Sequence, residues 1–116
     1  MSRDDGTLEA RYRKYAQGHG DGSRSGDFRT TNRNHDKLVA LLPELRAIGD
    51  RGEEILRRLM TDPSDAVAGW AATHSLPIAE KDALSTLRAI ARKGGIIGLD
   101  AEMVIKEWKG GRLTID

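Results

Sequence analysis

The stretch that decides the fold is MTDPSDAVAGWAATHSLP, residues 60–77, in which two prolines enclose a run of small apolar residues. Placing successive residues about 100° apart, as in an α-helix, gives this run two apolar sides. One side consists of Val67, Trp70, Ala71 and His74, and the other consists of Ala68, Ala72 and Leu76. Thr73 is almost alone in being expected to face solvent. Because a helix that is apolar on nearly all faces is packed from several directions, the sequence predicts the central helix of the domain here.

Two amphipathic helices are predicted before the central one. Residues 27–48 carry a helical stripe of leucine and isoleucine that Pro43 interrupts. Since proline removes a backbone donor and clashes with the preceding turn, we expect a kink or a break near Leu42. The following helix starts at Asp50, and Glu53 three residues later gives it the spacing of a capping box.

Two more helices are predicted after the central one, and a glycine-rich segment stands at the other end of the chain. The apolar pattern predicts helices over residues 79–92 and 99–109, each ended by a glycine pair. Near the N-terminus, residues 7–16 predict a short first helix. Four glycines within residues 18–26 predict a mobile loop, because each glycine costs about 1 kcal/mol relative to alanine inside a helix. A phosphate-binding loop is disfavoured there, since the Gly-Lys-Ser/Thr ending is missing.

The composition describes one modest domain without a dominant charge. The chain has 116 residues, of which 38% are hydrophobic and 4% aromatic, and its formal net charge is +1. The near-neutral balance gives no long-range attraction toward nucleic acid or a membrane. There is no cysteine and no run of apolar residues long enough to span a bilayer, so we expect a cytoplasmic protein.

A weak internal repeat accompanies these helices. The spacing of Val67, Ala72 and Leu76 returns 29 residues later as Ile96, Ala101 and Ile105. Each copy follows an amphipathic helix, and helical pairs that recur at such an interval are typical of α-solenoids. The pattern therefore favours stacked helical hairpins.

Residues 59–76, LMTDPSDAVAGWAATHSL, resemble a HEAT-type repeat, although Ala68 stands where such repeats usually carry arginine. The chain also resembles a family of small bacterial proteins catalogued as the domain of unknown function numbered two thousand and nineteen. That resemblance rests on residues 30–52, 62–77 and 95–113. It implies a compact, all-helical, HEAT-like fold without an established active site. Some relatives look like immunity proteins encoded beside bacterial toxins.

The residues that could carry chemistry do not form a recognisable catalytic or metal-binding motif. His19, His35 and His74 lie in three different segments, without the spacing of a metal site. We therefore expect no catalytic residue, no metal and no cofactor. His74 shares a helix side with Trp70, so it is either a hydrogen-bonded histidine at a packing seam or a polar group at a recognition groove.

Together these observations predict an all-α, single-domain, right-handed superhelix of HEAT-like hairpins with five or six helices. Residues 1–26 are expected to form a flexible helix and glycine-rich loop, and residues 27–113 the helical core. The leading functional hypothesis is a non-catalytic protein-binding module, specifically an immunity-type protein that neutralises a bacterial toxin domain. The candidate partner-binding residues are Trp70, His74, Glu102 and Lys106.

The alternative hypothesis is a nucleic-acid-associated HEAT-like protein. Its candidate phosphate contacts are Arg51, Arg57 and Arg58. Binding that depends on phosphate contacts weakens steeply as salt rises, so a salt titration separates the two hypotheses. The sequence does not indicate the oligomeric state.

Overall fold

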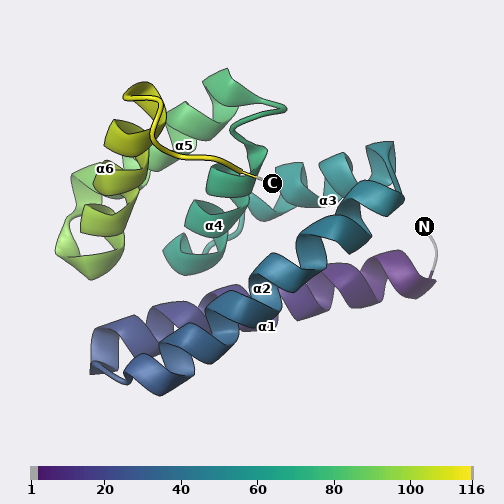
Figure 1. Ribbon diagram of the computed structural model, residues 1–116, viewed down its shortest axis with the longest axis horizontal. Helices are drawn as coiled ribbons and strands as arrows, with labels where there is room; N and C mark the ends of the chain where they lie inside the picture. Colours follow the sequence, from purple (N-terminus) through teal and green to yellow (C-terminus); the bar gives the residue numbers. More distant parts are fainter. Residues whose placement is uncertain (1–2, 116) are drawn as a thin grey trace.

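Six α-helices and their short connections make up the described part of the chain, residues 3–115 of a computed structural model (Figure 1). The helices are α1 (Arg3–Ser25), α2 (Phe28–Ala47), α3 (Asp50–Leu59), α4 (Asp65–Ser75), α5 (Glu80–Lys93) and α6 (Gly95–Lys109). No strand occurs among these residues, which confirms the all-α prediction. Within the same range, no helix combines the length and the apolar character needed to cross a membrane.

Helix α4 occupies the centre of the fold, as the sequence predicts. It packs against α1, α3, α5 and α6. Ser64 caps its N-terminus by accepting a hydrogen bond from the backbone N–H of Val67, and the helix ends two residues before Pro77. The expectation that Thr73 faces solvent is wrong. Thr73 is buried, and its hydroxyl donates to the backbone oxygen of Gly69 at 2.8 Å.

The largest difference from the sequence prediction is found in helix α1. The segment expected to be a mobile loop, residues 18–26, is helical through Ser25. Its glycines allow neighbouring helices to approach closely. A Cβ atom added to Gly20 would lie 2.6 Å from the Cβ atom of Ala66 on α4, and one added to Gly22 would lie 2.5 Å from the hydroxyl oxygen of Thr31 on α2. The packing that glycine permits therefore outweighs its poor helix propensity.

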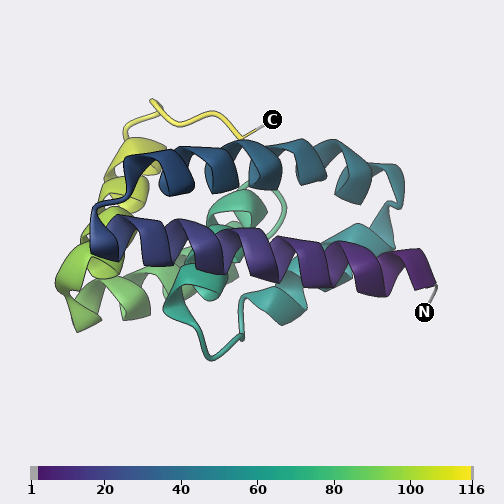
Figure 2. The same ribbon diagram turned by 90° about the horizontal axis from the view of Figure 1, so that it is seen from below.

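Helices α1 and α2 form a long hairpin that lies along one side of the molecule (Figures 1 and 2). The turn contains Gly26, whose φ is +76°, and Asp27, whose carboxylate accepts a hydrogen bond from the backbone N–H of Thr30. Helices α5 and α6 form a second hairpin on the other side of α4, and the start of α6 lies beside the α1–α2 turn in both views. Helix α4 therefore lies between the two hairpins.

Three other boundaries differ from the prediction. Helix α2 continues through Pro43 without a break, and the Pro43 side chain is exposed. The predicted capping box at Asp50 does not form, because Gly49 is the N-cap residue and no side chain caps α3. Helix α6 starts at Gly95, four residues earlier than predicted. Gly94 and Gly95 have φ values of +74° and +70°, so both glycines of the pair adopt the left-handed conformation at the turn between α5 and α6.

Candidate functional site

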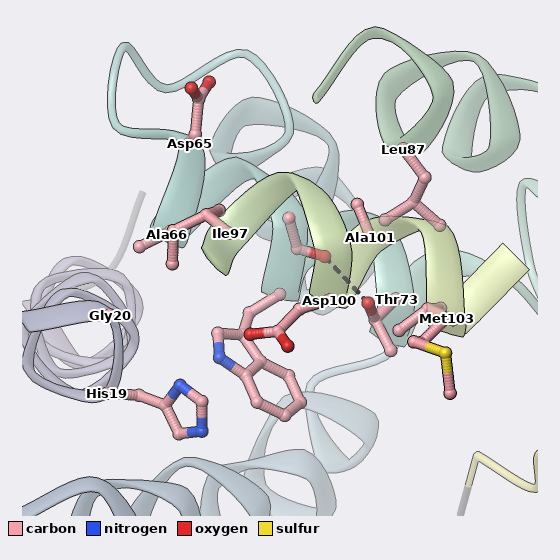
Figure 3. A pocket seen from close by; sticks show the side chains of 13 residues that line it. His19, Gly20, Asp65, Ala66, Thr73, Leu87, Ile97, Asp100, Ala101 and Met103 are labelled. Atoms are coloured by element: carbon pink, nitrogen blue, oxygen red, sulfur yellow. Dashed lines mark hydrogen bonds between the residues drawn. The ribbon is translucent and has the colours of Figure 1, made fainter. Parts of the chain in front are cut away.

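A cavity of about 330 Å³ lies between α1, α4, α5 and α6, and we call it the Trp70 cavity (Figure 3). Its walls are mainly apolar, and its polar side chains are His19, Asp65, Trp70, Thr73 and Asp100. Helices α4 and α6 contribute most of the lining, in equal shares. The small residues that keep α4 close to its neighbours also leave this space open beside the one large ring on the helix.

All three histidines of the sequence gather around Trp70. The ring centroid of Trp70 lies 5.0 Å from that of His19 on α1, 5.7 Å from that of His35 on α2 and 5.3 Å from that of His74 on its own helix. These histidines lie far apart along the chain, in three different helices, so their sequence spacing does not predict that they meet. Among the described residues, no three histidine or acidic side chains are placed to hold a metal ion.

His74 belongs to the core and not to the accessible surface. It is 7% exposed, and its Nδ1 atom shares a hydrogen bond of 2.7 Å with the hydroxyl of Tyr12, which is fully buried. Burial lowers the pKa of His74 to about 3, with smaller contributions from His35 and Arg46. Burial also raises the pKa of Tyr12 well above its ordinary value. Both groups are therefore neutral at neutral pH.

His19 and Asp100 face the same space from α1 and α6 (Figure 3). Burial lowers the pKa of His19, and His35 lowers it further, while Asp100 opposes both effects. Asp100 is exposed overall, and the partial burial of its carboxyl group raises its pKa, while His19 acts in the opposite direction. Asp100 makes no hydrogen bond or ion pair with any other residue between 6 and 115.

The predicted partner-binding residues do not form one cluster. Trp70 is partly buried in the wall of the Trp70 cavity, and His74 lies behind it in the core. Glu102 and Lys106 are exposed on α6 and do not line the cavity.

Two of the three arginines of the alternative hypothesis form ion pairs with acidic side chains. Arg57 lies 3.6 Å from a carboxylate oxygen of Asp82, and Arg58 lies 2.8 Å from one of Glu9. Arg51 is exposed at the start of α3. The three residues therefore share a helix, but two of their charges are already compensated by neighbouring helices.

An exposed apolar row on α6 is the feature that the sequence analysis missed. Ile96, Leu99 and Met103 are 47%, 58% and 49% exposed, and their spacing of three and four residues places them on one face of the helix. Glu102 and Lys106 flank this row at helical spacing. The apolar residues of this helix do not by themselves indicate which of them stay exposed, because apolar residues on an amphipathic helix are usually buried.

No family model matches the chain, and no curated protein matches it. A solved structure with a similar fold is the crystal structure of the protein RPA1889 from Rhodopseudomonas palustris, with a TM-score of 0.84 and 23% sequence identity. The match covers 97% of this chain and 93% of that chain. At this identity the likeness shows the fold alone. The resemblance to HEAT-like repeats and to the family of unknown function stays a prediction.

Proposed function

We propose that the protein is a non-catalytic protein-binding module and that its partner docks on the outward face of α6. The observation that carries this proposal is the exposed row of Ile96, Leu99 and Met103. Contiguous exposed apolar side chains with a polar rim are typical of protein interaction sites. Here Glu102 and Lys106 supply a rim of both charge signs.

The rigidity of α6 supports this proposal. Helix α6 packs against α4, α5 and α1, so its outward face is held in place before any partner arrives. A preformed surface loses little conformational entropy on binding, which favours affinity. We therefore assign the partner contacts to α6 and give Trp70 the role of shaping the adjacent cavity.

Within this class, we propose an immunity-type protein that binds and neutralises a bacterial toxin domain. The test is to identify the product of the neighbouring gene, co-express it with this protein and measure growth, then measure the Kd of the purified pair by calorimetry. Leu99→Glu places a charge in the centre of the row and will weaken binding by at least about tenfold, with loss of growth protection.

The matched control is Ser85→Glu, which adds the same charge at an exposed position of α5. It is expected to leave both the Kd and the growth protection unchanged. A neighbouring gene without a toxin-like product would contradict the immunity proposal. A wild-type dimer that Leu99→Glu converts to a monomer would show that a second copy covers the row instead.

The nucleic-acid alternative has less support. It requires Arg51, Arg57 and Arg58 to present their charges together to phosphates. The ion pairs of Arg57 with Asp82 and of Arg58 with Glu9 use those charges within the protein. We therefore place this alternative second.

A further inference from the structure

The Trp70 cavity combines apolar walls, an indole and acidic side chains. It is lined by aliphatic residues of α4, α5 and α6, including Leu87, Ile97 and Val104. Its volume of about 330 Å³ is at the lower end of the range found for small-molecule sites. The space therefore suits a ligand of roughly one ring or a short alkyl chain.

The formal charges that line the cavity are all negative. Asp65 and Asp100 are its acidic residues, and no lysine or arginine is found among the described residues that line it. His19 is neutral at neutral pH, because burial and His35 lower its pKa. The cavity therefore disfavours anions.

The two carboxylates differ in whether their charge is already compensated. Asp65 accepts a hydrogen bond of 2.9 Å from the ammonium group of Lys93. Asp100 lines the cavity, is exposed to solvent over part of its surface, and has no such partner among residues 6–115. A carboxylate without a counter-ion at the edge of an apolar cavity is stabilised when a cation binds beside it.

We propose that the Trp70 cavity binds a small organic cation, with the apolar body of the ligand between α4 and α6 and its ammonium group beside Asp100. Trp70 adds a second attraction, because the face of an indole ring stabilises a nearby cation. This ligand site shares Met103 with the protein-docking row of α6, but it does not depend on the proposed immunity function.

The test uses benzylamine as the probe, with benzyl alcohol and benzoate as a neutral and an anionic probe of similar shape. Binding is followed by the NMR signals of the two indole N–H groups. Trp70 lines the cavity, whereas the indole N–H of Trp108 donates to Glu80 at 2.8 Å and serves as the internal reference. Benzylamine is expected to shift the Trp70 signal and to bind at least about tenfold more tightly than benzyl alcohol.

Asp100→Asn keeps the shape of the side chain and removes its charge. It is expected to weaken benzylamine binding by about tenfold and to leave benzyl alcohol binding unchanged. The matched control is Glu54→Gln, which removes one negative charge from an exposed position on α3. It is expected to leave benzylamine binding unchanged.

Three results would overturn the proposal. The first is the absence of any Trp70 shift at up to about 20 mM benzylamine, a concentration at which even weak fragment-sized ligands bind detectably. The second is binding of benzyl alcohol or benzoate as tight as that of benzylamine. The third is equal benzylamine affinity in Asp100→Asn and in the wild type, with the fold of the variant verified by the unchanged Trp108 signal.

Discussion

Tyr12 and His74 form a side-chain hydrogen bond inside a mainly apolar core. The Tyr12 side chain is fully buried, and its hydroxyl satisfies the Nδ1 atom of His74. Tyr12→Phe removes the hydroxyl and leaves that nitrogen without a partner in the core. We expect the free energy of unfolding to fall by about 1–3 kcal/mol, because an unsatisfied buried polar group has lost its hydration. Urea denaturation measures the change, and an unchanged or raised midpoint would contradict this account.

The neighbours of a single residue were predictable where both residues lie on the same helix. Trp70 and His74 share a helix side, so their proximity follows from the local sequence. His19, His35 and Asp100 reach the same region only through the packing of α1, α2 and α6. No local sequence pattern indicates that these three residues come together, so their proximity to Trp70 could not be predicted.

Helix α1 shows how packing overrides helix propensity. Gly20 lies against Ala66, where an added Cβ atom would meet that side chain at 2.6 Å, whereas Gly6 has open space around it. Gly20→Ala is expected to destabilise the fold by about 1–2 kcal/mol, since overpacking outweighs the gain in propensity. Gly6→Ala on the same helix is expected to stabilise it by about 0.5–1 kcal/mol. Thermal unfolding of both variants tests the prediction, and equal shifts of the same sign would refute it.

The elements that the sequence predicted well are those with a strong local signal. The central helix α4 follows from its small apolar residues between two prolines, and α2 follows from its periodic leucine stripe. The prediction of a loop at residues 18–26 was wrong, because the residues that make glycine favourable at positions 20 and 22 lie on other helices. These residues are Ala66 and Thr31. With α1 extended through that segment, a hairpin turning at residues 26–27 would have placed His19 opposite His35.

The stability of the domain as a unit is expected to depend on pH through its buried histidine. The pKa of His74 is about 3 in the folded state and about 6.5 when the chain is unfolded. Its folded pKa is lowered, so below pH 6.5 the unfolded state binds the proton preferentially. The stability present above pH 6.5 is therefore lost as the pH falls toward 3. His19, whose pKa is also lowered, acts in the same direction.

Between pH 6.5 and 4.5 the free energy of unfolding is expected to fall by about 2–3 kcal/mol through His74. The groups that face this imidazole are Tyr12, Trp70, His35 and Arg46, and none of them is an acid that would stabilise its protonated form. Urea denaturation across this pH range measures the slope, with His74→Gln as the variant in which the slope should become shallower. A free energy of unfolding that does not change over this pH range in the wild type would show that the His74 imidazole is hydrated in the folded state.

The glycines of α1 have a consequence for the order in which the chain acquires its structure. Three of them lie within five residues, at positions 18, 20 and 22, and together they disfavour an autonomous helix by about 3 kcal/mol. The glycines stabilise the folded helix only through close contacts with residues that are synthesised later. These residues are Asn34 and Thr31 on α2 and Ala66 on α4. We therefore expect this segment to complete its helix only once α2 and α4 are available to pack against it.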